Sequence, residues 1–193
     1  MKKTIKKVAV LGSGIMGSRI ACHFANIGVK VLLLDMVPRE LTDAEKSRGL
    51  SLEDKVVRNR IVNEALQSTL KSNPSPIYDK DFASRIATGN FDDDLEKIKD
   101  YDWVIEVIVE RLDIKKQMFE KVDRFRKEGT FISSNTSGIP IHLMAEAMGH
   151  AFVDSMAHYG DPEHEHRRSQ RHPAAHRGLG RRRRGDTGRR GDK

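Results

Sequence analysis

Short continuous apolar runs alternate with amphipathic stretches along most of this 193-residue chain. The first run is residues 8–11 and ends just before Gly12. The second is residues 29–35 and ends at Asp35. Such runs are typical of parallel strands that are buried on both faces. Residues 15–27 carry apolar side chains at helical spacing, and Gly28 stands where that helix would end. The side chains expected on its apolar face are Ile15, Ile20, Phe24 and Ile27.

The same alternation continues to about residue 148. The further strands predicted are residues 84–91, 103–110 and 129–138, the last of which runs into a polar loop. The further helical segments predicted are residues 39–72, 92–102, 112–127 and 139–148. Because strands and helices alternate, the pattern predicts an α/β protein. Its parallel sheet would be covered by helices on both faces and carry a helical insertion after the second strand.

The first predicted strand leads into a glycine-rich turn, GSGIMG, in which Gly12, Gly14 and Gly17 have the spacing G-x-G-x-x-G. Between a strand and a helix, the first glycine permits the tight turn and the second lets the backbone approach a pyrophosphate. The third lets the helix pack on the strand. Asp35 follows 18 residues after Gly17, where an acid accepts hydrogen bonds from an adenosine ribose and repels a 2′-phosphate. These features predict a Rossmann-type doubly wound parallel sheet that binds NAD rather than NADP.

Three segments together resemble the N-terminal NAD-binding domain of 3-hydroxyacyl-CoA dehydrogenases over residues 5–148. They are VAVLGSGIMGSRIACHFANIGVKVLLLD, DWVIEVIVERLDIKKQMFEKV and SSNTSGIPI, in the family's order and spacing. The resemblance implies an NAD-dependent oxidation of 3-hydroxyacyl-CoA to 3-ketoacyl-CoA, as in fatty-acid β-oxidation. In that family NAD accepts the hydride from C3, a histidine takes the hydroxyl proton, and a carboxylate holds the histidine.

The resemblance also implies roles for individual residues. Besides the glycine loop and Asp35, Glu110 and Lys115 match family positions near the cofactor. Asn135 and Ser137 match a polar loop in which the serine hydroxyl would bind the substrate oxygen or the nicotinamide. Ser137 is therefore the candidate catalytic residue, and the others are candidate cofactor-binding residues. From residue type alone, a turn or a helix cap would explain Asn135 and Ser137.

The resemblance weakens near residue 150. The family continues into a G-x-H-F-F-N-P motif, which holds the catalytic histidine, and then into a helical domain that forms the acyl site and the dimer. The nearest stretch here is AHYGDP, with His158, where Asp161 replaces the family's asparagine. We therefore expect the family's dimer domain to be absent and turnover of 3-hydroxyacyl-CoA to be negligible, while NAD binding survives.

Composition changes after Ala157. The last 36 residues hold 11 of the 35 Lys and Arg but only 5 of the 28 Asp and Glu, and Leu179 is the only large apolar residue of 162–191. Such a segment buries too little apolar surface to offset its ordering entropy. We expect an NAD-binding domain over residues 1–150 and a disordered tail, rich in Arg, Gly and His, over residues 151–193. A shifted reading frame in a GC-rich gene accounts for this composition.

The tail leaves a second hypothesis open, a non-catalytic NAD-binding domain with a basic arm that binds nucleic acid. We do not expect a nucleic-acid partner, because no aromatic residue follows Tyr159 to stack on bases. His164 and His166 form an isolated pair in the tail, which is a weak metal site, and no metal is predicted.

Net charge and cysteine content say less about the function of the protein. The tail supplies nearly all of the net charge of +7, so the sequence pI of 9.6 says nothing about partners of the folded part. Cys22 is the only cysteine, which excludes an intramolecular disulfide, and its place in a helical pattern predicts a core residue. No apolar run approaches the roughly 20 residues that span a bilayer. We expect a cytoplasmic protein without a membrane partner.

Overall fold

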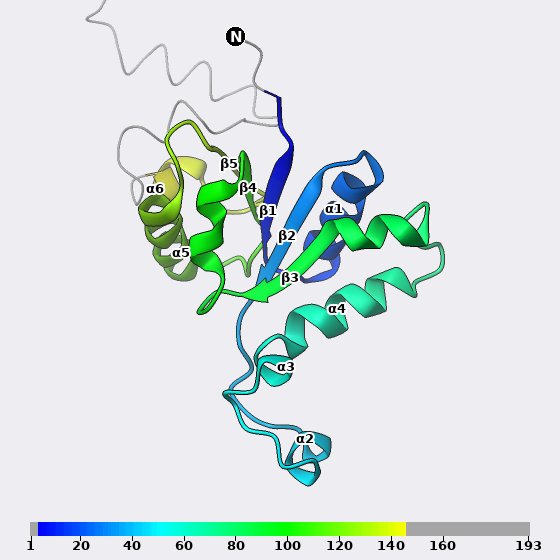
Figure 1. Ribbon diagram of the computed structural model, residues 1–193. Coiled ribbons are helices and arrows are strands. Elements are labelled where there is room, and N and C mark those ends of the chain that lie inside the picture. Colours follow the sequence, from blue (N-terminus) through cyan, green and yellow to red (C-terminus); the bar gives the residue numbers. More distant parts are fainter. Residues whose placement is uncertain (1–3, 146–193) are drawn as a thin grey trace, which may run out of the picture. The chain divides into compact units, whose positions relative to one another are not determined.

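The computed structural model describes residues 4–145, and within them five parallel strands form one sheet (Figure 1). The strands are β1 (Lys7–Leu11), β2 (Lys30–Asp35), β3 (Ile86–Asn90), β4 (Trp103–Glu106) and β5 (Phe131–Ser134). Their order in the sheet is β3-β2-β1-β4-β5. The chain therefore builds the sheet outward from β1, first to one side and then to the other, and the predicted doubly wound α/β fold is confirmed.

Helices cover both faces of this sheet. The α-helices are α1 (Ile15–Asn26), α2 (Asp43–Ser47), α3 (Lys55–Arg58), α4 (Arg60–Leu70), α5 (Leu112–Phe125) and α6 (Ile141–Ala145). Two 3₁₀ helices, η1 (Lys80–Arg85) and η2 (Leu95–Asp100), complete the described part of the chain. The buried side chains of α1 and α4 pack on one face, and those of η2, α5 and α6 pack on the other (Figure 1).

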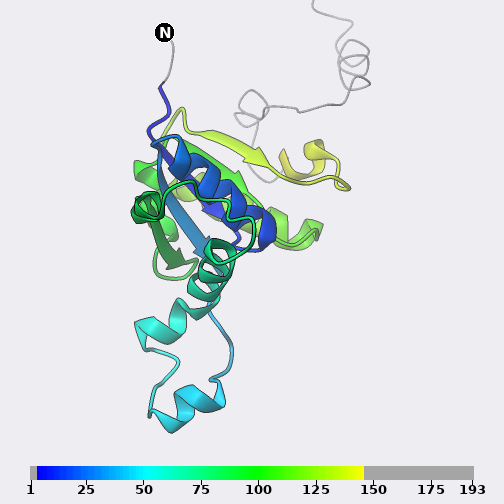
Figure 2. The same cartoon turned by 90° about the vertical axis from the view of Figure 1, so that its right-hand side faces the viewer.

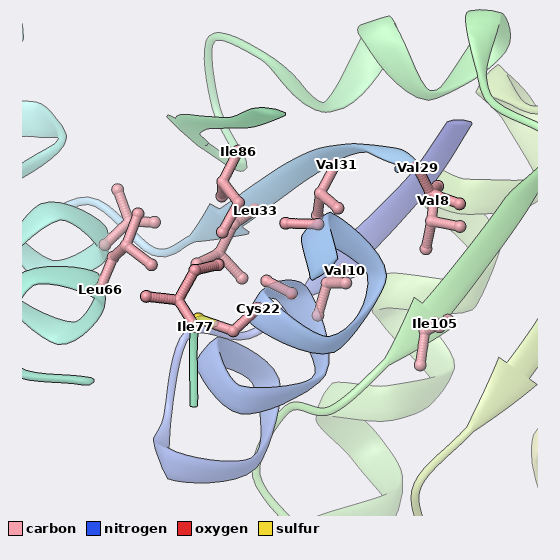
Figure 3. Packing of buried hydrophobic residues seen from close by; sticks show 13 residues of the cluster. Val8, Val10, Cys22, Val29, Val31, Leu33, Leu66, Ile77, Ile86 and Ile105 are labelled. Carbon is pink, nitrogen blue, oxygen red and sulfur yellow. The ribbon is translucent and has the colours of Figure 1, made fainter. Parts of the chain in front are cut away.

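The strands are continuously apolar because both of their faces are covered. Successive side chains of a strand point to opposite faces. Val8 and Val10 of β1 belong to the same buried cluster as Cys22 of α1 (Figure 3), whereas Ala9 and Leu11 belong to the cluster under α5. All five side chains are fully buried, which confirms the prediction of a core cysteine.

Helix α1 has the predicted length but a different buried face. Of the predicted apolar face, Ile20 and Phe24 are partly buried against the core. Ile15 and Ile27 are 78% and 61% exposed, so their predicted place on that face is wrong. The buried residues of α1 are Gly17, Ser18, Ala21, Cys22 and Ala25. Small side chains bring the helix axis close to the sheet, and this packing outweighs the hydrophobicity of the larger residues at either end of the helix.

Two predicted boundaries also differ from the structure. The strand predicted to end at Glu110 ends at Glu106, because residues 107–111 leave the sheet and form the connection to α5. The helical stretch predicted over residues 39–72 is three separate helices, since Gly49 adopts a φ of +70° between the first two of them.

The insertion after β2 contains α2, α3 and α4, and Figures 1 and 2 show α2 and α3 projecting beyond the carboxyl ends of the strands. Thr42 caps α2, with Glu45 completing a capping box. The Arg60 guanidinium donates to the Glu45 carboxylate and so ties α2 to α4. The predicted helical insertion is confirmed.

The boundary at 150/151, the tail and His158 lie outside the described residues, so these expectations remain predictions. Within residues 4–145, no helix combines the length and the apolar character that crossing a bilayer requires.

Candidate functional site

The glycine turn between β1 and α1 has the geometry that its sequence predicts. Gly12 has a φ of +107°, which favours glycine, and its N–H donates to the Leu34 carbonyl at 2.8 Å. A Cβ on Gly12 would lie 2.6 Å from the Val107 carbonyl oxygen, and one on Gly17 would collide with the Gly12 carbonyl. These two glycines therefore allow the start of α1, the end of β1 and the connection after β4 to meet.

Gly14 differs from the other two glycines because the position that a Cβ would take on it lies in open space. A Cβ at this position would have no atom of the described residues within 4 Å. Gly14 is the N-cap of α1, and no side chain caps it. The first turn of a helix has backbone N–H groups without helical acceptors, and together with the helix dipole they favour an anion. This end of α1 therefore has both the space and the donors that a pyrophosphate requires.

Asp35 ends β2 beside this turn. Its Oδ2 accepts hydrogen bonds from the N–H and the Oγ of Ser13, both at 2.6 Å, and its Oδ1 accepts one from the Met36 N–H at 2.7 Å. The acid predicted to bind the ribose is therefore held against the glycine turn across 22 residues of sequence. Ser13 was not predicted from the sequence, although a short polar side chain between Gly12 and Gly14 is a signal that could have found it. The structure buries it.

A second group of polar residues lies after β4 and β5. Lys115, on α5, is 1% exposed, and its Nζ lies 2.6 Å from Oε1 of Glu106, which is fully buried. The same Glu106 oxygen accepts the Ile108 N–H at 2.7 Å, and its Oε2 accepts the Ser134 hydroxyl. Glu106 was not predicted from the sequence, because an acid inside an apolar run can equally mark the end of a strand.

Glu110 holds the loop that follows β5. Its Oε1 accepts the Thr136 hydroxyl, the Ser137 N–H at 3.1 Å and the Gly138 N–H at 2.9 Å. Its Oε2 lies 3.5 Å from the Lys115 ammonium. The hydrogen bond from Thr136, aided by the Gly138 amide and the Lys115 charge, lowers the pKa of Glu110 to about 2, against the opposite effect of burial. Glu110 is therefore ionised at neutral pH.

The structure brings all the predicted site residues to the carboxyl-terminal ends of the parallel strands, where they form two groups. One group is the glycine turn with Asp35, after β1 and β2. The other contains Glu110 and Lys115 with the loop of Asn135 and Ser137, after β4 and β5. The strand order reverses between these groups, at β1 and β4, and ligands of open α/β sheets bind in the crevice at such a point. Asn135 and Ser137 are exposed, whereas the Lys115 side chain is buried against Glu106 and Glu110.

Comparison with known proteins places this geometry in context. The family described as 3-hydroxyacyl-CoA dehydrogenase, NAD binding domain, matches residues 7–166, which extends beyond the predicted domain boundary at residue 150. A probable 3-hydroxyacyl-CoA dehydrogenase of Bacillus subtilis is 50% identical over 152 residues, covering 79% of this chain. One of Deinococcus radiodurans is 42% identical over 160 residues, covering 82% of this chain.

Solved structures agree on the fold. The (S)-3-hydroxybutyryl-CoA dehydrogenase of Ralstonia eutropha superimposes with a TM-score of 0.53 at 25% identity, over 79% of this chain and 48% of that one. A 3-hydroxybutyryl-CoA dehydrogenase of Escherichia coli also gives a TM-score of 0.53 at 25% identity, over 83% and 30%. The chain spans only 19% of the Bacillus relative and 42% of the Deinococcus relative.

Proposed function

Because this chain belongs to the 3-hydroxyacyl-CoA dehydrogenase family, matching its NAD-binding domain, we propose that it binds NAD for the oxidation of 3-hydroxyacyl-CoA to 3-ketoacyl-CoA. NAD would lie across the carboxyl ends of the parallel strands, from β2 to β5. Bound there, it would accept the hydride from C3 of the substrate in the family's reaction. That reaction would place the protein in fatty-acid metabolism. Because AHYGDP stands where the family has its catalytic motif, we expect this chain by itself to bind NAD but to turn over 3-hydroxyacyl-CoA negligibly.

The observation that carries the proposal is the contrast among the three glycines. Gly12 and Gly17 are required by contacts within the protein, because a Cβ on either meets backbone atoms. Gly14 is not, since a Cβ there would meet none of the described residues within 4 Å. A glycine with free space, at the uncapped start of α1, suits the close approach of a pyrophosphate.

The other residues have distinct proposed roles. Asp35 would accept hydrogen bonds from the adenosine ribose and disfavour a 2′-phosphate, since Ser13 and Met36 hold it in place. Ser137 would bind the substrate oxygen or the nicotinamide through its hydroxyl, with Asn135 beside it. Glu110 and Lys115 lie on the same side of the crevice, and their assignment to the cofactor site stays a prediction.

Calorimetric titration of the full chain tests this function. We expect saturable binding of NAD and NADH, with NADP at least tenfold weaker, because a phosphate on the ribose would meet the Asp35 carboxylate. An Asp35→Asn variant should narrow the difference between NAD and NADP. Absence of heat and of a thermal shift with all three dinucleotides would refute the proposal.

We also propose that the protein is cytoplasmic. Cys22, its only cysteine, is fully buried and its thiol is free. A single cysteine that forms no disulfide suits the reducing environment of the cytoplasm. Separating cytoplasmic, periplasmic and membrane fractions of the producing cells tests the location, and recovery outside the cytoplasm would contradict it.

A further inference from the structure

We propose that Glu110 is a positioning residue that holds the loop after β5, residues 135–138, in the shape that receives the nicotinamide half of the dinucleotide. This inference rests on the proposed function and adds to it. It assigns Glu110 an action through the loop, with the buried pair of Glu106 and Lys115 as its support.

The first argument is the number of donors on one oxygen. Glu110 Oε1 accepts three hydrogen bonds from three consecutive residues, Thr136, Ser137 and Gly138. A carboxylate that binds successive backbone N–H groups fixes the backbone dihedrals between them, and charge-assisted hydrogen bonds are stronger than neutral ones. The Thr136 Oγ1 also accepts the Ile139 N–H at 3.4 Å, so the constraint extends to the start of α6.

The second argument is the rigidity of the support beneath Glu110. Its Oε2 faces the Lys115 ammonium at 3.5 Å, and Lys115 is fixed by Glu106 at 2.6 Å. Glu106 also accepts the Ser134 hydroxyl, from the strand that leads into the loop. The loop is therefore held at both ends by one connected network, which joins β4, α5 and β5.

The third argument is the position of the loop along the crevice. Asp35, proposed to bind the adenosine ribose, follows β2 on one side of β1, whereas residues 135–138 follow β5 on the other side. A dinucleotide that crosses the strand reversal with its adenosine at β2 brings its nicotinamide to β4 and β5. Ser137 and Asn135 are exposed on this side, and the side chain of Ser137 makes no hydrogen bond that would compete with a ligand among the described residues.

The fourth argument is that the loop has little else to fix it. Asn135, Ser137 and Gly138 are exposed, so apolar packing contributes little to their order. The Asn135 N–H does donate to the Glu106 carbonyl at 2.8 Å, which continues the pairing of β5 with β4. Beyond that residue, the hydrogen bonds to Glu110 are the main restraint. Their loss would leave three donors to water and the loop free to sample other conformations.

Calorimetry with NADH and with ADP-ribose, which lacks the nicotinamide, tests the inference on the full chain. For Glu110→Ala we expect NADH affinity to fall at least tenfold, towards that of ADP-ribose, while ADP-ribose affinity stays within twofold. Glu110→Gln keeps an oxygen acceptor and loses the charge, so it should recover part of the loss. Glu120→Gln, an exposed carboxylate of α5 outside the site, is the matched control and should leave both affinities unchanged.

Hydrogen exchange supplies a readout that does not depend on a ligand. In Glu110→Ala the amides of Ser137 and Gly138 should exchange at least tenfold faster, with the amides of β1 and β2 unchanged. Thr136→Ala removes one donor without touching Glu110 and should shift exchange and NADH affinity in the same direction, by a smaller factor. It also keeps the test decisive should Glu110→Ala fail to fold.

The two proposals fail differently. If neither NADH nor ADP-ribose binds to the unaltered chain, the proposed function is wrong and the inference falls with it. If both bind but the Glu110 variants weaken them equally or not at all, the positioning role is wrong and NAD binding stands. Equal affinity of the unaltered chain for NADH and ADP-ribose would also overturn the inference, because the loop would then contribute nothing to the nicotinamide half.

Discussion

Glycine is required at three positions of the turn for two different reasons. At Gly12 and Gly17 the backbone of the protein itself occupies the space of a side chain. At Gly14 that space is open, and the proposed ligand would occupy it. The same residue type therefore serves folding at two positions and binding at the third, and substitution by alanine separates the two.

We predict that Gly14→Ala and Gly17→Ala affect different properties. Gly17→Ala should lower the free energy of unfolding by about 1–3 kcal/mol, because α1 must move away from Gly12 to admit the methyl group. Gly14→Ala should change stability by less than about 1 kcal/mol and lower NAD affinity at least tenfold. Urea unfolding and NAD calorimetry measure both effects. A stable Gly14→Ala variant with undiminished affinity would contradict the assignment of the pyrophosphate to this turn.

A buried ion pair is a second feature at this scale. We predict that Lys115→Met lowers the free energy of unfolding by about 3–5 kcal/mol, because it leaves the Glu106 charge buried without its partner. The double variant Lys115→Met with Glu106→Gln should recover much of this loss, since the amide still accepts the Ile108 N–H. Urea denaturation of the unaltered chain, the two single variants and the double variant measures the coupling energy between Lys115 and Glu106. Additive effects of the two substitutions would show that the pair is not coupled.

The helical insertion is held at the sheet by polar contacts. The Nε and Nη2 atoms of Arg58 donate to the two carboxylate oxygens of Asp93 at 2.7 Å each. The Asn90 side chain donates to Asp93 and, at 2.8 Å, to Asn59, which links the end of β3 to the insertion. These contacts join α3 and Asn59 to the residues after β3, in addition to the apolar packing of Val62 and Leu66 of α4 against the sheet.

These contacts predict a pH dependence. The Arg58 hydrogen bond, with that of Asn90, lowers the pKa of Asp93 from 3.8 to about 2. A carboxyl whose pKa is lower in the folded state stabilises the fold above the unfolded pKa and loses that contribution as the pH falls through the folded pKa. The free energy of unfolding of the unaltered chain should therefore be higher than that of the Arg58→Ala variant. This difference should be largest above about pH 4 and should shrink as the pH falls towards 2.

Urea unfolding at pH 6, 4 and 3 measures this difference. Glu53 and Asp92 also face Arg58, at 3.5 and 3.9 Å, so their protonation acts in the same direction. Lys46→Ala removes an exposed ion pair with Asp43 and is the control, because solvent screens such a pair and it contributes little to stability. A pH-independent difference between the unaltered chain and Arg58→Ala would contradict the assignment.

At the scale of the whole molecule, the candidate site residues and the excess of positive charge lie in different parts of the chain. The candidate site residues lie between Gly12 and Ser137, whereas the excess of arginine lies in the last 36 positions. The family match ends at residue 166, which leaves residues 167–193 beyond it. Whether these residues bind nucleic acid is therefore separable from NAD binding.

We predict that removing residues 167–193 leaves the dissociation constant for NAD within twofold, because none of the proposed contacts comes from this segment. Calorimetry on the shortened and the full chain measures it. Salt-dependent binding of single-stranded RNA or DNA by the full chain, lost on this deletion, would favour the nucleic-acid hypothesis. Resequencing the gene from codon 140 onward in all three frames tests the frame-shift interpretation directly.

Most of the fold could be predicted from the sequence, because its determinants are local. A continuous apolar run, a G-x-G-x-x-G turn and a helical repeat each act within about 20 residues, and they determined the order of strands and helices. The turn and Asp35 likewise predicted a dinucleotide site. The end of β4 was misplaced because residues 107–109 are as apolar as the strand, and apolarity does not show where pairing stops.

Only the tertiary structure decided which residues meet. The sequence does not show that Ser13 binds Asp35, that Glu106 pairs with Lys115, or that Glu110 holds the loop after β5, since these contacts join separate elements. Nor does it show that α1 buries its small side chains and exposes Ile15, because the Gly12–Gly17 approach sets how close the helix lies. Local patterns determine the elements, whereas contacts distant in sequence depend on how those elements pack, and the chemistry of the candidate site depends on those contacts.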